Sequence, residues 1–309
     1  MINTRELTIA LPSSKAKGWM ASILQMLHDK TVTHKKLQQL VGRLNHVAYV
    51  VPGAQHFLGN LRKAESIAGS RPSLRYTLRN SDRKDLLLWV RLLEYAEQGM
   101  SLNLLTTRKI NTWWRSDACK HGIGGYNLRT GRAWRWVLPE ELRFRVSINV
   151  LEFLGCYINY RLAAMEGEIE ENDIIFLEGD NSSAISWLEK TNASDDEQAS
   201  PHDRPILLKI AREVARIMMD TKTAIFPGHV PGKKNDVSDV LSRDYHLSND
   251  ELTALLFCHV PEQLTKDFSI SPLPQTIVSQ VSTWLTLETQ TKDASYQPTE
   301  SDHSTGSCG

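Results

Sequence analysis

The chain is poor in cysteine and has no long hydrophobic run. Its 309 residues contain only four cysteines, and no two of them form a Cys-x-x-Cys pair. This scarcity argues against a zinc site or a disulfide framework and fits a reducing compartment. No window approaches eighteen uninterrupted apolar residues, and the N-terminus lacks a basic segment followed by an apolar one. We therefore expect no membrane span and an intracellular protein, in the cytoplasm or the nucleus.

The chain also lacks net charge, but its charges are unevenly spread. It has 36 Lys/Arg and 36 Asp/Glu in total, whereas residues 1–100 hold 15 Lys/Arg and 7 Asp/Glu, a local excess of eight positive charges. The acidic surplus lies further along, around residues 195–197 and among the carboxylates discussed below. A basic flank beside an acidic, metal-binding centre suits a polyanionic substrate. The alternative is that these charges are solvated helix faces.

Hydrophobic residues in the first hundred positions recur with a helical period. Between residues 37 and 48 they follow the i, i+3, i+4, i+7 pattern, with Thr33 as a candidate N-cap. Asn80-Ser81-Asp82 opens another strongly amphipathic helix, which Gly99 ends. Residues 1–105 are therefore predicted to form a small, mainly helical domain.

From about residue 106 the hydrophobic period shortens towards two, which indicates strands. The expected strands, of which the first three look like an antiparallel meander, cover Ile110–Ala118, Gly124–Leu128, Ala133–Leu138, Asp173–Leu177 and Ala224–His229. The expected helices cover Ile148–Met165, Asn181–Leu188, Pro205–Met219 and Asp236–Ser242, with a polar loop at Thr191–Ser200. This order predicts an α/β domain over residues 106–246, with a mixed five-stranded sheet and helices on both faces. Residues 247–309 are predicted to form short helices and a disordered polar tail.

Four carboxylates occupy places from which a metal ion could be bound. Asp117 ends a strand, Glu152 sits in an apolar helix, Asp180 falls between a strand and a helix, and Asp239 lies in the last helix of the domain. Carboxylates at strand ends and on helices are what a site needs to hold two divalent metals against a phosphodiester. The glycines of Gly122-Ile-Gly-Gly125 leave room for a phosphate beside the first of them.

Each carboxylate also has an ordinary structural explanation. Asp117 could be a turn residue, Glu152 could lie on the exposed edge of its helix, and Asp180 could be an N-cap. Asp239 could be a solvated residue one turn into the last helix, and Asp236 shares its helix face, so spacing alone does not choose between these two. The order of the four carboxylates within one run of strands and helices is what favours a common site.

The motifs around these carboxylates resemble those of the ribonuclease H-like domain of retrotransposon reverse transcriptases, in particular of gypsy-like and DIRS-type elements. The first three motifs of that family are similar to Ser116-Asp117-Ala118 with Gly122-Ile-Gly-Gly125, to Asn149-Val-Leu-Glu152 and to Gly179-Asp180-Asn181-Ser182. The last motif is similar to His229-Val-Pro-Gly-Lys-Lys-Asn235 followed by Ser238-Asp239-Val-Leu-Ser-Arg243, although Ser238 stands where the family usually has Ala. The resemblance places the fourth catalytic carboxylate at Asp239 and leaves Asp236 as its neighbour.

The resemblance implies a two-metal endonuclease that cleaves the RNA strand of an RNA–DNA hybrid. Asp117, Glu152, Asp180 and Asp239 would be the catalytic residues and the ligands of two Mg²⁺ ions, for which Mn²⁺ could substitute. Recognition would depend on groove shape and 2′-hydroxyls rather than on base sequence.

The resemblance also extends upstream of the carboxylates. The segment Thr33–Leu61 resembles the thumb or connection segment that follows the polymerase palm, while the chain has no Tyr/Phe-x-Asp-Asp polymerase motif. We therefore expect the C-terminal part of a reverse transcriptase without polymerase activity. Its partners would be the hybrid and the remainder of the polyprotein.

Aromatic residues near the carboxylates are candidates for the substrate surface. On strands, Trp113 and Trp114 would face opposite sides, while Trp134 and Trp136 would share one side. Trp114 and Trp136 could line the hybrid or pack in the core. His229 could assist product release, although a loop histidine more often has no catalytic role.

Two non-enzymatic alternatives stay open. One is a catalytically inactive, connection-type domain that only binds nucleic acid, and the other is a decayed element fragment without activity. The presence of all four carboxylates argues against the first. A metal-dependent hybrid-cleavage assay separates both from the enzyme.

Overall fold

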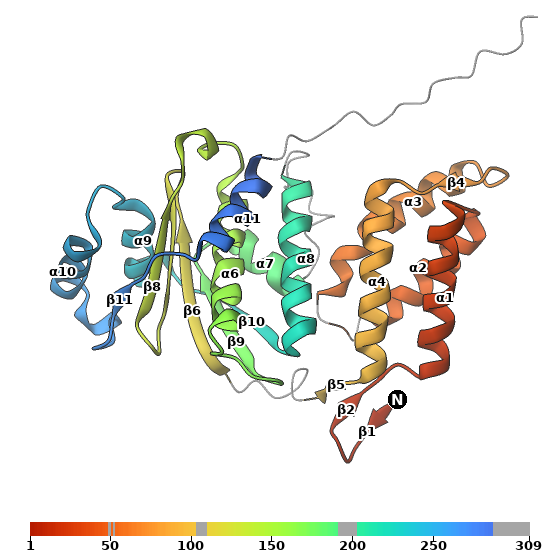
Figure 1. Cartoon of the computed structure of the whole chain (residues 1–309), viewed down its shortest axis with the longest axis horizontal. Helices are drawn as coiled ribbons and strands as arrows, with labels where there is room; N and C mark the ends of the chain where they lie inside the picture. Colours follow the sequence, from red (N-terminus) through yellow and green to blue (C-terminus); the bar gives the residue numbers. More distant parts are fainter. Residues whose placement is uncertain (49–50, 52, 103–109, 191–202, 287–309) are drawn as a thin grey trace, which may run out of the picture.

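The chain is arranged in two parts that lie side by side (Figure 1). The computed structural model describes residues 1–48, 51, 53–102, 110–190 and 203–286. Residues 1–102 form a bundle of helices, called the helical region below, and residues 110–286 form a sheet covered by helices, called the α/β body. The boundary predicted near residue 105, the predicted loop at Thr191–Ser200 and the predicted polar tail all lie outside the described residues.

The helices of the helical region bury the apolar faces from which they are predicted. They are α1 (Ser13–Asp29), α2 (His34–Ala48), α3 (Gly59–Ser70) and α4 (Asn80–Gln98), with a short 3-10 helix at Ala54–Phe57. Every apolar residue in the pattern between residues 37 and 48 is buried, which confirms the predicted amphipathic helix. Gly99 follows α4 with a φ of 95°, a conformation that favours glycine, and it ends the helix as predicted.

Five short strands of the helical region are missing from the sequence prediction. One small sheet contains β1 (Ile2–Asn3), β2 (Thr8–Ile9) and β5 (Met100–Ser101), and another contains β3 (Thr31–Val32) and β4 (Tyr76–Thr77). Each strand is two residues long, which is too short to show an alternating pattern in the sequence.

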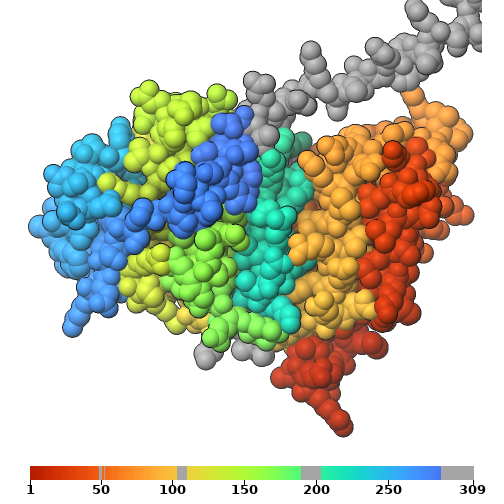
Figure 2. Space-filling model, in the orientation of Figure 1, coloured from red at the N-terminus to blue at the C-terminus, as the bar shows by residue number. Residues whose placement is uncertain are grey.

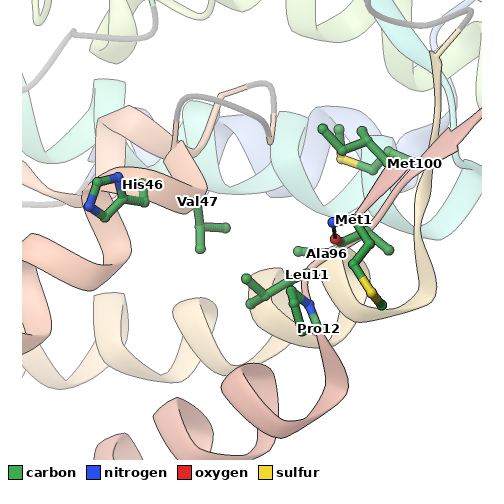
Figure 3. A pocket seen from close by; sticks show the side chains of 9 residues that line it. Met1, Leu11, Pro12, His46, Val47, Ala96 and Met100 are labelled. Carbon is green, nitrogen blue, oxygen red and sulfur yellow. Dashed lines mark hydrogen bonds between the residues drawn. The ribbon is translucent and has the colours of Figure 1, made fainter. Parts of the chain in front are cut away.

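A cavity of about 170 Å³ opens in the helical region (Figure 3). Its walls come from the N-terminal segment (Met1, Leu11 and Pro12), from α2 (His46 and Val47), from α4 (Ala96) and from Met100. None of the four predicted carboxylates lines it, so it is separate from the site described below.

The α/β body is built on a mixed sheet. Its antiparallel strands β6 (Ile110–Ala118), β7 (Gly122–Asn127) and β8 (Arg132–Val137) form the predicted meander. β9 (Ile174–Gly179) pairs parallel with β6, and β10 (Ala224–His229) pairs parallel with β9. The order across the sheet is β10-β9-β6-β7-β8-β11, which confirms the predicted α/β class and the mixed sheet.

The prediction of five strands is wrong by one. The sixth strand, β11 (Ser269–Ile270), joins the edge of the sheet parallel to β8. The amide of Ser269 donates to the carbonyl of Gly131, 3.1 Å away, in the turn between β7 and β8. This strand also has only two residues and exists because the chain after residue 247 packs against the sheet, so no local pattern announces it.

Helices cover both faces of the sheet, as predicted. One face carries α6 (Ile148–Met165), α7 (Ser182–Lys190), α8 (Arg204–Thr221) and α11 (Gln275–Thr286), and the other carries α9 (Asp236–Arg243) and α10 (Asn249–His259) (Figure 1). Side chains of β7 alternate accordingly, because Ile123 packs in the core with α6 and Tyr126 packs in the core with α9. Among these described helices, none is both long and apolar enough to cross a bilayer.

Helix α8 contributes to the apolar cores of both parts. Its residues Ile206, Leu207, Ile210 and Ile217 join the core of the α/β body, and Ala211, Ala215, Met218 and Met219 join the core of the helical region. Figure 2 shows α8 lying between the two parts. A helix with apolar residues on two sides is buried between two layers, so α8 holds the two parts together.

Candidate metal centre

Two of the predicted carboxylates lie at the same edge of the sheet. β6 and β9 are parallel neighbours, with Arg115 opposite Glu178. Asp117 follows the first of these by two residues and Asp180 follows the second by two residues. Because parallel strands end at the same edge, this register brings the two carboxylates together.

The alternative explanations for these two aspartates do not hold. Asp117 still belongs to β6 and is only 2% exposed, so it is not a turn residue. At the start of α7 the side chain of Asn181 accepts the hydrogen bond from the amide of Ala184, at 3.0 Å. Asn181 therefore caps the helix, and Asp180 is left without that role.

The third carboxylate, Glu152, reaches the same edge from helix α6. It is 4% exposed, and its Oε1 accepts a hydrogen bond from the amide of Ala118 at 3.1 Å. Gly155, one turn further along, allows the helix to approach β6 closely, because a Cβ there would lie 3.0 Å from the side chain of Ser116. The structure thus overturns the exposed-edge explanation for Glu152, which is buried with a partner.

Asp117, Glu152 and Asp180 form a carboxylate cluster. One oxygen from each lies within 4.8 Å of the others, which is an arrangement that could hold a metal ion. Burial raises the pKa of Asp117 to about 6, with smaller upward contributions from the charges of Asp180 and Asp239. Burial, followed by the charge of Asp117, raises the pKa of Glu152 to about 9. Crowded, buried carboxylates favour bound protons, and a cation would favour their charged forms instead.

The fourth predicted ligand, Asp239, is beside this cluster rather than in it. Its side chain is 41% exposed, and its Oδ1 pairs with Nε of Arg243 at 2.6 Å. Burial raises its pKa, which the charge of Arg243 lowers and that of Asp180 raises. Asp236 points to a different partner, because its Oδ2 accepts a hydrogen bond from Gln263 at 2.7 Å. The structure therefore brings three of the four predicted carboxylates together and leaves the fourth adjacent.

Ser242 is a residue of the site that sequence reasoning missed. Its hydroxyl donates to Oδ2 of Asp117 at 2.6 Å, and it is 1% exposed. This hydrogen bond lowers the pKa of Asp117 against the larger effect of burial. The only signal in the sequence is its position three residues after Asp239, which places it on the same side of α9.

The expectation that glycines leave room for a phosphate is wrong. A Cβ on Gly122 would lie 2.7 Å from the carbonyl oxygen of Ser242, and one on Gly124 would lie 2.4 Å from the side chain of Leu241. A Cβ on Gly125 would collide with Asn159 and Trp134 on the opposite face. The space beside β7 is therefore filled by α9 on one face and by Asn159 of α6 and Trp134 of β8 on the other, and the first two glycines let α9 carry Ser242 to Asp117.

The tryptophans expected to line a hybrid pack inside the body. Trp114 is fully buried and donates to Glu168 at 2.9 Å, while Trp136 is 8% exposed and belongs to the same core. Neither forms part of a substrate surface. Trp113 points to the opposite side of β6, as predicted, and donates to Glu178 at 2.6 Å.

His229, at the end of β10, contacts the backbone of the cluster. Its Nε2 lies 3.0 Å from the carbonyl oxygen of Asp180, and because a carbonyl can only accept, Nε2 is the donor. This hydrogen bond fixes the position of the ring beside Asp180.

Comparisons with known proteins give no family for this chain. No protein-family model matches it, and no curated protein matches it significantly.

Proposed function

We propose that this protein is a ribonuclease H-like, metal-dependent endonuclease that cleaves the RNA strand of RNA–DNA hybrids. The observation that carries the proposal is the convergence of Asp117, Glu152 and Asp180 from two strand ends and a helix. The same three residues stand in the motifs that resemble those of retrotransposon reverse transcriptases. The chain would be the C-terminal part of such an enzyme and would act inside the cell.

The donor set fits a hard divalent cation. Carboxylate oxygens are the protein ligands that Mg²⁺ prefers, and no sulfur or imidazole belongs to the carboxylate cluster. Asp117, Glu152 and Asp180 would hold the metal, and Asp239 would complete the site. Bound Mg²⁺ would acidify a water for attack on phosphorus and neutralise the leaving 3′-oxygen.

The protein's own residues would prepare the site for this chemistry. Ser242 orients Asp117, and the amide of Ala118 orients Glu152. These two carboxylates are only 2% and 4% exposed, so their burial excludes competing water from the ligand oxygens. Arg243 holds Asp239 beside the cluster, and this exposed pair can separate at small cost.

A nucleic-acid-binding protein without catalysis is the second candidate function. The observation that favours it is the pairing of Asp239 with Arg243, which leaves three carboxylates in the cluster. The excess of positive charge in residues 1–100 would serve binding in either case.

Hybrid cleavage tests the proposal. The purified chain with Mg²⁺ should cleave RNA only when it is paired with DNA, and EDTA should abolish cleavage. Asp117→Asn should keep hybrid binding and lose cleavage, because it removes a metal ligand and preserves the side-chain shape. Equal cleavage by this variant would remove Asp117 from the site, and binding without cleavage by the wild type would establish the second candidate. Primer extension should stay at background with any metal.

A further inference from the structure

Phe144 is exposed and conformationally strained. Its side chain is 66% exposed, and its φ of 63° lies in the left-handed region that bulky residues rarely occupy. Strained backbone of this kind concentrates at binding and catalytic sites, since the fold must hold it in place. An aromatic ring held in water by such a backbone indicates a contact surface.

Phe144 belongs to a group of rings and cations, which we call the aromatic platform: Lys120, His121, Arg143, Phe144 and Tyr245. The ring of His121 lies edge-on to Phe144 at 5.9 Å and tilted against Tyr245 at 5.3 Å. Nζ of Lys120 lies 5.3 Å from the centre of the Phe144 ring, and the guanidinium of Arg143 lies 5.9 Å from that of Tyr245. Tyr245 is itself 42% exposed.

The aromatic platform adjoins the carboxylate cluster. Lys120 follows Asp117 by three residues in the turn after β6, a span of at most about 11 Å. Phe144 lies on the segment that leads into α6 and Glu152, while Tyr245 follows α9, whose Ser242 contacts Asp117. Each of the three segments that form the platform therefore also supplies a residue of the site.

We propose that the aromatic platform binds an unpaired nucleotide of the substrate, next to the scissile strand. A nucleotide combines a flat base, which stacks on exposed rings, with a phosphate, which attracts Lys120 and Arg143. Oε1 of Glu140 lies 3.8 Å from Nη1 of Arg143, and the Glu140 side chain is highly exposed, so a phosphate can replace it as the partner of Arg143. This inference rests on the proposed function and deepens it: the preferred substrate is a hybrid that carries a single-stranded extension.

Binding in EDTA tests the platform independently of cleavage. Fluorescence anisotropy would compare a blunt RNA–DNA hybrid with the same hybrid carrying an oligothymidine extension. The wild type should bind the extended hybrid more tightly. Phe144→Ala should weaken that binding on the order of tenfold and leave binding of the blunt hybrid unchanged, because the variant has no ring on which the unpaired base can stack.

Phe257 provides the matched control. It is another exposed phenylalanine, 42% exposed on α10, and its ring lies edge-to-face with that of Phe268, with the ring centres 6.2 Å apart. Phe257→Ala should therefore leave both affinities unchanged. If Phe144→Ala fails to fold, Phe144→Asn replaces it, because asparagine tolerates the left-handed backbone and carries no aromatic ring.

The outcomes separate this inference from the proposed function. If the wild type prefers the extended hybrid and Phe144→Ala abolishes this preference, the result supports the aromatic platform, even if Mg²⁺ produces no cleavage. Equal binding of both hybrids by the wild type, or the same weakening in Phe257→Ala, overturns the platform, even if cleavage is robust. Weaker binding of both hybrids by Phe144→Ala also overturns it, because the ring would then bind the duplex.

Discussion

Two buried carboxylates of the helical region have arginine partners, as Glu178 of the α/β body has in Arg115 at 2.8 Å, whereas two other buried carboxylates of the body have none among the described residues. In the helical region Asp82 pairs with Arg79 at 3.1 Å, and Asp85 pairs with Arg212. In the body Asp117 and Glu152 are also buried, but the hydrogen bonds that they accept within the described part of the chain come from a hydroxyl and an amide.

A carboxylate buried with an arginine already has its counter-charge and serves the fold. A carboxylate buried without one raises the free energy of the folded state, unless a proton or a cation joins it. The comparison therefore separates structural carboxylates from those available to a ligand, and the following experiments test this separation.

Asp239 lies between the two groups, because it has an arginine partner but stands beside the carboxylate cluster. We expect its substitution to have the largest effect on hybrid cleavage among these experiments. Asp239→Asn should reduce hybrid cleavage by more than the roughly 10–100-fold typical of removing an outer partner of a metal ligand. Asp236→Asn should cost about 0.3–1 kcal/mol of stability through the helix dipole and little cleavage. The difference in cleavage between Asp239→Asn and Asp236→Asn should become smaller at high Mg²⁺ or with Mn²⁺. A more damaging Asp236→Asn would mean that the fourth ligand is misassigned.

Loss of the hydrogen bond from Ser242 to Asp117 should have the next largest effect on hybrid cleavage. Ser242→Ala should reduce cleavage about 10–100-fold, because Asp117 loses the group that orients it. Ser238 is the matched control, a buried serine on the same helix whose hydroxyl has no partner among the described residues. Ser238→Ala should leave cleavage unchanged in the same assay. Equal losses in the two variants would assign the effect to packing of α9.

The pair between Asp85 and Arg212 should matter for stability. Asp85→Asn should lower the free energy of unfolding, measured in urea, by about 3–5 kcal/mol, because it leaves Arg212 without its charge partner. Arg91 and Asp220 join the same two helices at 2.7 Å, but both side chains are exposed. Asp220→Asn should therefore cost only about 0–1 kcal/mol. Equal effects would contradict a structural role for the buried pair.

Glu152 should make the metal-free protein less stable as the pH rises. Its pKa is about 9 in the folded protein and 4.5 as the reference value, so the folded state holds a proton that the unfolded state releases between these pH values. The resulting stabilisation is complete below about 4.5 and is lost as the pH rises through about 9. The Tm of the wild type, measured in EDTA, should fall relative to Glu152→Gln across this range. Parallel curves would contradict the raised pKa.

Removing basic charges from the helical region should produce the smallest change, a change in how hybrid affinity depends on salt. Lys36 and Arg43 are both exposed and lie two turns apart on the same side of α2. Neutralising both to glutamine should flatten the slope of log affinity against log salt by about 0.9 for each phosphate that the variant no longer neutralises. Lys266→Gln, an exposed lysine of the body, is the control. An unchanged slope in the double variant would make these charges a solvated helix face.

Much of the α/β body follows from local sequence. The strand Ile110–Ala118, the helix Ile148–Met165 and the strand Ala224–His229 have the bounds that hydrophobic period and turn residues predict. Two-residue strands such as β11 have no period and depend on a partner elsewhere in the chain. Local pattern could not reveal them.

The site was less predictable than the fold around it. Three of the four predicted carboxylates meet, but the burial of Glu152 depends on the close approach of α6 to β6 at Gly155, which is a tertiary contact. The same holds for Ser242, since the glycines that admit it are far away in the sequence. Sequence motifs identify which groups carry charge, whereas helix packing decides which of them lose water.

The double apolar surface of α8 has a consequence for how the chain can be divided. A fragment that begins after the helical region would expose Ala211, Ala215, Met218 and Met219 to water, together with Arg212. Such a fragment would tend to self-associate, although its own sheet is complete. The two parts are therefore expected to unfold as one cooperative unit. A protein into which the α/β body is transferred would have to supply another apolar surface that packs against α8.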